Sequence, residues 1–145
     1  PKEGYIKCLK KAMEYFLSDD ITLWFNTSWL SQNEWIPGES NDDGLPFSSY
    51  LNSPKMKYRA GAQYSKDKVR AAVAYQHDDA FYANQGLFSG DVQEKNLFDI
   101  NVGYNVSDNL KLDLSATNVL DQKYRAFPNM PVIGRRTVLK LTFDY

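Results

Sequence analysis

Apolar and polar residues alternate with a period of two along most of this 145-residue chain. In the last segment, for example, Leu139, Leu141 and Phe143 alternate with Lys140 and Thr142. Successive side chains of a β-strand point to opposite faces, so this period predicts strands with one apolar and one polar face. The alternation predicts strands over residues 21–29, 56–64, 69–76, 98–106, 110–117 and 137–145. We therefore expect an all-β protein.

The connections between these segments alternate in length. Short turns lie at residues 18–20, 66–68 and 107–109, and connections of about 15 to 18 residues lie at 37–53, 78–95 and 120–134. In an antiparallel up-and-down meander, successive connections fall at opposite ends of the sheet. The sequence thus predicts short turns at one end and long loops at the other, which is typical of an outer-membrane barrel.

The first segment is less clear than the others. Residues 5–17 carry three lysines and fit an amphipathic helix as well as a strand. We predict a strand, because a three-residue turn joins this segment to the next, and this gives about seven strands in all. Seven strands leave two open edges, which hydrocarbon does not tolerate. Together with a start, Pro1-Lys2-Glu3-Gly4, that is unlike a signal peptide, this predicts that residues 1–145 form a single segment of a larger barrel.

Composition excludes several classes of site. Basic and acidic residues nearly balance, at 17 and 18, so we expect no nucleic-acid partner. One cysteine, Cys8, and one histidine, His77, exclude an internal disulfide and a closed Cys/His zinc site. The acidic stretch from Glu39 has Tyr50 where a calcium loop needs glutamate. We expect neither a bound metal nor a cofactor.

The apolar faces have two possible environments. Segments of about 10 to 12 residues suit tilted strands that cross a bilayer, and aromatic rings gather near their ends, as in membrane barrels. The alternative is a soluble β-sandwich that binds a ligand or a carbohydrate, in which the apolar faces form the core. We favour the membrane barrel, because a sandwich does not need all its long loops at one end.

A more specific pattern lies near the end of the chain. Asn118, Asp121 and Tyr124 form an N-x-x-D-x-x-Y element after the penultimate segment. A loop containing proline, glycine and arginine follows, and the final segment closes on Phe143-Asp-Tyr145. This arrangement resembles the C-terminal end of TonB-dependent outer-membrane receptors.

The resemblance implies a 22-stranded barrel in the bacterial outer membrane, with a plug domain that is not in this chain. It implies import of a scarce nutrient, such as a ferric siderophore, cobalamin or an oligosaccharide. Transport would be powered by the TonB complex acting through the plug. It also implies that the barrel-assembly machinery inserts the protein, with Phe143 and Tyr145 as the terminal signal.

Eight aromatic residues lie in or next to the long connections and are candidates for ligand binding: Trp35, Phe47, Tyr50, Phe81, Tyr82, Phe88, Tyr124 and Phe127. Such rings can stack on a ligand or pack the loops against one another. Four basic residues, Lys55, Lys57, Arg59 and Arg70, are expected on the interior face, where a watery lumen or a plug would accommodate them.

An enzyme is not expected. His77 stands beside Asp78 and Asp79, which makes a His–Asp pair conceivable. No Gly-x-Ser-x-Gly element accompanies it, and Cys8 is remote in sequence, so the chain offers no catalytic residues.

Overall fold

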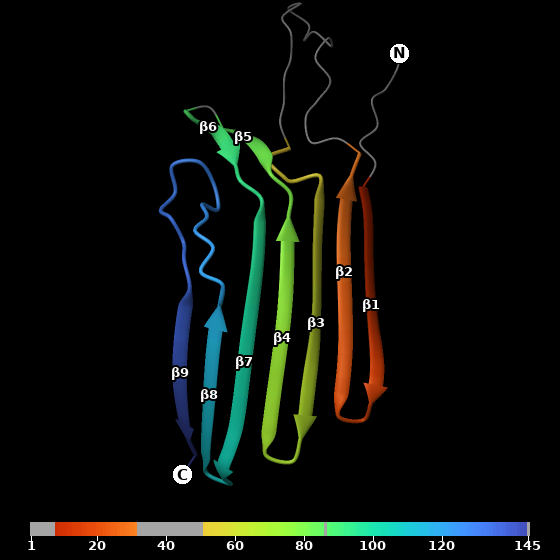
Figure 1. Cartoon of the computed structure of the whole chain (residues 1–145), viewed down its shortest axis with the longest axis vertical. Coiled ribbons are helices and arrows are strands. Elements are labelled where there is room, and N and C mark those ends of the chain that lie inside the picture. Colours follow the sequence, from red (N-terminus) through yellow and green to blue (C-terminus); the bar gives the residue numbers. More distant parts are fainter. Residues whose placement is uncertain (1–7, 32–50, 86, 145) are drawn as a thin grey trace, which may run out of the picture.

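A single antiparallel sheet of seven strands dominates the computed structural model, which describes residues 8–31, 51–85 and 87–144 (Figure 1). The strands are β1 (Cys8–Ser18), β2 (Ile21–Leu30), β3 (Met56–Lys66), β4 (Val69–Asp78), β7 (Lys95–Ser107), β8 (Leu110–Thr117) and β9 (Arg136–Phe143). The order of these seven strands in the sheet follows their order along the chain, with β4 paired directly with β7. The predicted meander of seven strands is confirmed, including a strand over the described part of the first segment.

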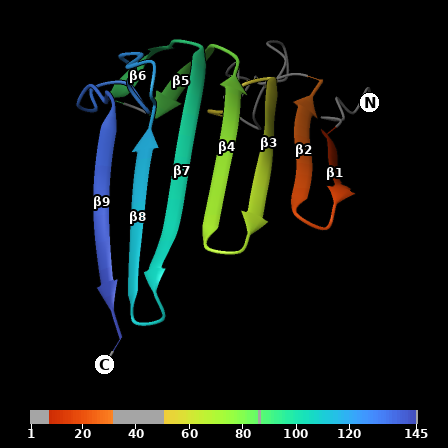
Figure 2. The same cartoon turned by 60° about the horizontal axis from the view of Figure 1, so that its bottom comes forward.

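The second long connection holds two further strands that the alternation did not predict. β5 (Phe81–Gln85) and β6 (Phe88–Val92) pair as a short hairpin between β4 and β7 (Figure 2). Each strand has five residues, too few to show a clear period of two, and Gly90 interrupts the second. A segment expected as loop is therefore partly ordered as a sheet of its own.

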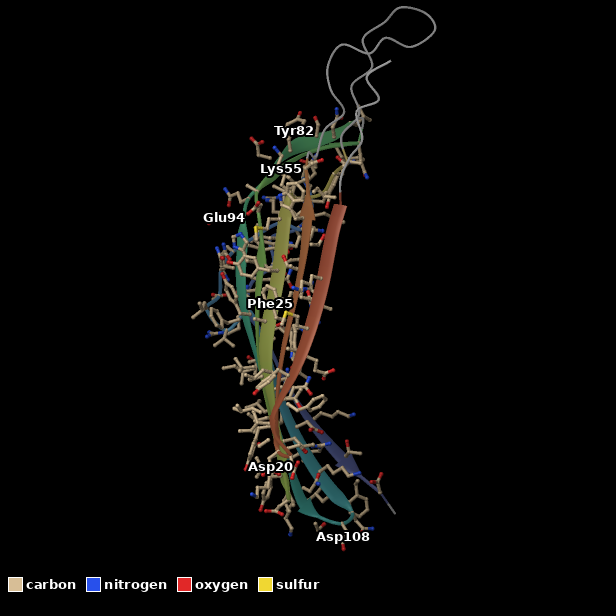
Figure 3. All side chains as sticks on the ribbon, turned by 90° about the vertical axis from the view of Figure 1, so that its right-hand side faces the viewer. Asp20, Phe25, Lys55, Tyr82, Glu94 and Asp108 are labelled. Atoms are coloured by element: carbon tan, nitrogen blue, oxygen red, sulfur yellow. The ribbon has the colours of Figure 1, made fainter. Side chains whose placement is uncertain are left out.

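Short turns and long connections lie at opposite ends of the sheet, as predicted. Asp20 and Asp108, in the β1–β2 and β7–β8 turns, mark one end, and Lys55 and Tyr82 mark the other (Figure 3). Below, these are called the turn end and the loop end. The chain returns to the loop end between β2 and β3, between β4 and β7, and between β8 and β9.

Strand register divides the side chains between two faces. Residues directly opposite each other in neighbouring strands share a face. Leu114 is paired with Val102 on one side and with Leu139 on the other, which continues an apolar row across three strands. Asp113 is paired with Gly103 and Lys140 on the opposite face. The predicted separation of leucines from charged residues in β8 and β9 is confirmed.

The described residues do not cover the apolar face with a second layer. Phe25, Val73 and Leu139 in the strands are 36%, 43% and 62% exposed. Among the described residues, the buried apolar side chains are only Ala83, Val92 and Leu97, of which Leu97 lies on the polar face of β7. Over residues 8–31, 51–85 and 87–144, the fold therefore lacks the core between two sheets that the soluble-sandwich alternative requires, and Figure 3 shows the sheet edge-on as one layer.

Two glycines make room for neighbours on the polar face. A Cβ at Gly61 would lie 2.5 Å from the indole ring of Trp24, which explains why this tryptophan breaks the alternation of β2. Arg70 on β4 pairs with Asp113 on β8 at 3.2 Å (Nη2–Oδ1). This ion pair passes over β7 at Gly103, where a Cβ would lie 2.6 Å from the carboxylate. Glycine at that position allows strands on either side of β7 to interact directly.

Candidate functional site at the loop end

The β5–β6 hairpin contacts segments from the other two long connections. Asn84 in β5 donates its backbone N–H to the Asn52 side-chain oxygen at 2.7 Å, and the Asn52 amide donates to the Asn84 carbonyl at 3.2 Å. On the other side, a Cβ at Gly90 would lie 3.6 Å from Pro128, which is ordinary packing distance. Three connections that are far apart in sequence therefore meet at the loop end.

The N-x-x-D-x-x-Y element continues the chain from the loop end of β8 and stays hydrogen-bonded beside the start of β7. Asn118 is buried, and its side-chain amide accepts the Gln122 N–H at 3.0 Å and donates to the Gln122 carbonyl at 2.8 Å. The Gln122 side chain accepts the Asn96 N–H at 2.7 Å and donates to the Glu94 carbonyl at 3.2 Å. An amide side chain offers a donor and an acceptor side by side, as a peptide group does. These two side chains thus replace backbone ladder bonds.

Asp121 joins the two ends of the third connection. Its Oδ1 accepts hydrogen bonds from Lys123 Nζ at 2.8 Å and from the Arg135 N–H at 2.7 Å. The Lys123 hydrogen bond, followed by that from Arg135, holds the pKa of Asp121 below its usual range. Gly134 is required beside them, because a Cβ there would lie 2.8 Å from the same carboxylate oxygen.

Tyr124, the last residue of the element, is held by backbone and ring contacts. It forms a two-bond bridge with Ile133, at 3.1 and 2.8 Å, which narrows the loop. The ammonium group of Lys95 lies 5.4 Å from the centre of its ring, within range of a cation–π interaction. Lys95 also pairs at 2.9 Å with the buried carboxylate of Asp78, so this tyrosine is anchored to both β4 and β7.

Two hollows flank β6, with volumes of about 320 and 440 Å³. The lining of the first includes Asp91, Gln93, Lys123, Tyr124 and Arg125. The lining of the second includes Lys55, Phe81, Tyr82 and Asp91. Both hollows are open to solvent, and their linings combine apolar rings with charged groups. Such surroundings can hold a ligand that has both flat apolar parts and polar substituents.

The predicted ligand-binding residues lie in different places. Phe81, Tyr82 and Tyr124 line the hollows, whereas Phe88 is exposed near the hairpin tip and Phe127 lines neither hollow. Outside the described residues are Trp35, Phe47, Tyr50 and Tyr145. Phe143 is exposed on the apolar face of β9.

The polar members of the linings were not among the predicted ligand-binding residues. Asp91, Gln93, Lys123 and Arg125 come together only because two connections fold side by side. No spacing in the sequence indicates that proximity.

His77 belongs to an aromatic cluster on the apolar face. Its ring stacks on Tyr58 at 4.7 Å, and its nitrogens lie 2.8 Å from Asn96 Oδ1 and 3.0 Å from Asp79 Oδ1. Asp78 does not pair with His77, because its carboxylate is bound by Lys95 and Gln76. Within the described ranges, the hydrogen-bond partners of the two ring nitrogens are Asn96 and Asp79, and neither is a hydroxyl or thiol nucleophile. The hydroxyl of Tyr75 donates to the same oxygen of Asn96 and so is linked to His77 only indirectly.

Across residues 8–31, 51–85 and 87–144, no three His, Cys, Asp or Glu side chains are grouped so that they could hold a metal ion. The same part of the chain contains no helix with the length and apolarity needed to cross a membrane.

No family model matches the chain, and no curated protein matches it in sequence. Solved structures match its fold. The ferric enterobactin receptor PfeA of Pseudomonas aeruginosa matches 97% of this chain with a TM-score of 0.68 and 14% identity. The ferric-catecholate import receptor Fiu of E. coli K12 matches 95%, with a TM-score of 0.72 and 15% identity. The copper transporter OprC matches 94%, with a TM-score of 0.66 and 16% identity.

These three proteins are TonB-dependent receptors. The chain has the fold of a wall segment of a TonB-dependent receptor barrel. It spans only 20 to 23% of the length of each of these receptors. The resemblance seen in the sequence is thus confirmed at the level of the barrel fold.

Replacing Asn118 should loosen the third connection. Asn118→Ala removes both amide hydrogen bonds to Gln122 and places alanine at a φ of +53°. We expect the free energy of local opening around Gln122 to fall by about 3 kcal/mol. Each hydrogen bond contributes about 1 kcal/mol, and the left-handed backbone conformation costs alanine about 1 to 2 kcal/mol. Hydrogen exchange of the Gln122 amide measures it. Asn129→Ala is the control, because Asn129 has a φ of +64° without that clamp; equal effects would contradict the clamp.

The Asp121 contacts should depend on acidity. Because the folded-state pKa of Asp121 lies below the usual value of about 3.9, its contribution to stability is present above that value. It is lost as the pH falls through the lowered pKa. We expect protection of the Arg135 amide from hydrogen exchange to decrease below pH 4, and Asp121→Asn to remove this dependence. An unchanged pH profile in that variant would contradict the assignment.

Proposed function

We propose that this chain is part of the barrel wall of a bacterial outer-membrane receptor that imports a scarce nutrient. The observation that carries the proposal is the uncovered apolar face, which continues across all seven strands, on a fold shared with receptor barrels. Among the strands that the structure describes, β1 and β9 each have one edge without a partner, so a closed barrel needs further strands.

The apolar face suits contact with lipid. The seven long strands contain 8 to 13 residues, and a tilted strand needs about 9 to 11 to cross the hydrocarbon. Rings lie toward both ends of this face: Tyr58, Tyr75 and His77 at the loop end and Tyr64 and Tyr104 at the turn end. Aromatic rings favour the two interfaces of a bilayer. The opposite face, with Arg70, Asn101 and Asp113, then lines a watery lumen.

Ligand capture is assigned to the loop end. The two hollows beside β6 are the described sites there, and Phe81, Tyr82 and Tyr124 provide rings that can stack on a ligand. The candidate nutrients are a ferric siderophore, cobalamin or an oligosaccharide. A plug outside this chain would transmit the action of the TonB complex, and the barrel-assembly machinery would insert the protein through the terminal strand that carries Phe143.

An enzymatic role fits less well. Similarity to transport receptors supports a receptor, and His77 is held by Asn96, Asp79 and Tyr58 on the face assigned to lipid. Its position favours a structural role at the membrane interface.

The proposal predicts different effects for three ring substitutions in the intact receptor. Tyr82→Ala should weaken binding about 10-fold or more, because a stacked large side chain contributes about 1 to 3 kcal/mol. Tyr104→Ala is a matched control, since this ring is 44% exposed against 41% for Tyr82 but lies at the turn end of the apolar face. His77→Ala should leave binding nearly unchanged.

Ferric enterobactin, cyanocobalamin and a maltooligosaccharide provide the ligand panel, and binding is measured on outer-membrane preparations. Equal losses in Tyr82→Ala and Tyr104→Ala would contradict loop capture. A His77→Ala protein that binds normally but loses a catalysed reaction would overturn the transport proposal.

A further inference from the structure

Three alanines interrupt the large side chains of the apolar face. Ala60 and Ala62 on β3 and Ala71 on β4 share this face, and Ala62 lies between Leu23 on β2 and Val73 on β4. Because alanine offers only a methyl group, the surface is lower over these positions than on either side of them. We call the three residues and the space above them the alanine groove.

The turn-end part of the alanine groove holds a hollow of about 350 Å³ that is open to its surroundings. A hydrocarbon chain makes more dispersion contacts along such a groove than on a flat wall. Lipid tails are as apolar as the protein surface, so in a bilayer these packing contacts distinguish the groove from the rest of the face. The lining of the hollow includes Ile21, Ala62, Tyr64, Ala71, Val73 and Ile100.

An ion pair lies at the turn end of the alanine groove. Lys66 is two residues beyond Tyr64 on the same face of β3, which places it roughly 7 Å further along the strand. Its Nζ lies 3.0 Å from Asp20 Oδ2, and the two side chains are 54% and 35% exposed. The apolar hollow thus ends beside a positive and a negative group, both of which solvent or a ligand can reach.

The position of this ion pair differs from that of the other pairs at the turn end. Arg70–Asp113 and Lys111–Asp144 belong to the polar face, as the register of β7, β8 and β9 shows. Among the described residues, Lys66 and Asp20 therefore form the turn-end pair that adjoins the apolar face. An amphipathic ligand on that face would meet charge there.

The pair keeps hydrogen-bonding capacity for such a ligand. An ammonium group has three donors, and the contact with Asp20 uses one of those of Lys66. Within the described part of the chain, the second carboxylate oxygen of Asp20 accepts no hydrogen bond. The β1–β2 and β3–β4 turns add Asp19, Asp67 and Lys68, so a head group with net negative charge is disfavoured. A head group that carries both a phosphate and an ammonium matches the pair.

We propose that the alanine groove binds one acyl chain of a phospholipid whose phosphate and ammonium groups contact Lys66 and Asp20. The inference rests on the proposed receptor function, which places the apolar face of β3 against lipid. It goes beyond general lipid contact, because it assigns one position on the wall and a preference among head groups. Phosphatidylethanolamine fits best, since its primary ammonium has N–H groups to donate to Asp20.

Native mass spectrometry of the intact receptor in detergent tests the head-group preference. The probes are phosphatidylethanolamine, phosphatidylcholine and phosphatidylglycerol with identical acyl chains. Choline has no N–H to donate to Asp20, and the glycerol head group has no positive charge. We expect phosphatidylethanolamine to bind about 3- to 10-fold more tightly than either, a modest preference because exposed ion pairs contribute little. Equal affinity for the three lipids would overturn the inference.

Two variants separate the groove from the charged pair. Ala71→Leu fills the hollow and should weaken the binding of all three lipids. Ala116→Leu is its matched control, because Ala116 lies on the same face of β8, opposite Ile100, but does not line the hollow. Lys66→Gln should remove the preference for phosphatidylethanolamine, and Lys66→Arg should keep it by retaining the charge. Lys111→Gln is the control for charge, since it breaks an exposed turn-end pair on the polar face.

Both controls should leave lipid affinity within about twofold of the original. An equal loss in a control, or unchanged lipid binding in Ala71→Leu or Lys66→Gln, would overturn the inference. Binding of ferric enterobactin, cyanocobalamin and a maltooligosaccharide is measured on the same receptor preparation. Nutrient binding without a head-group preference would overturn this inference alone. A receptor that shows the preference but binds no nutrient of the panel would overturn the proposed function alone.

Discussion

Cross-strand pairing in a fixed register is the interaction on which the rest of this structure depends. Because opposite residues share a face, a slip of one residue in any strand would move its apolar side chains to the polar face. Two contacts limit such slips. Trp24 lies over Gly61, and the Arg70–Asp113 pair crosses β7 at Gly103. In each case a side chain on the polar face fits only where the adjacent strand presents glycine. A slip in register would place a larger residue there, so these glycines favour the observed register.

The loop end uses side-chain amides where the backbone ladder stops. Asn52 binds the backbone of Asn84, Asn118 binds that of Gln122, and Gln122 binds the peptide groups on either side of Lys95. Each amide provides a donor and an acceptor, which makes the loops continuous with the sheet although they do not form long strands. The hollows beside β6 are therefore built on anchored segments, as a binding site requires if its rings are to be held in place.

Much of the fold could be predicted from the sequence, because a sheet with one apolar and one polar face leaves a period of two in most of its long strands, although this period is unclear in β1 and is broken by Trp24 in β2. The placement of the short turns at one end of the sheet and the long loops at the other could be predicted from the lengths of the connections. β5 and β6 could not be predicted in this way, since five residues with a glycine carry too little of that period. The element from Asn118 to Tyr124 is recognisable by its resemblance to the family pattern, but its role as a replacement for ladder bonds depends on the contacts of Gln122 with Glu94 and Asn96 at the start of β7, which the sequence does not indicate. Asp91 and Arg125 line the smaller hollow beside β6 only because two connections meet there, and no local sequence pattern indicates that meeting.

We propose that the apolar face of the sheet meets lipid and that the polar face meets water. Spin labels attached to cysteine at 112, 113 and 114, one per protein and with Cys8 replaced by serine, test it most directly in the membrane-inserted receptor. Collision with dissolved oxygen reports lipid, and collision with a neutral nickel chelate reports water. We expect high oxygen accessibility at 112 and 114 and high nickel accessibility at 113, because Leu112 and Leu114 lie opposite Leu141 and Leu139 while Asp113 lies opposite Lys140. Nickel accessibility at all three positions, or shielding of 112 and 114 from both reagents, would contradict it.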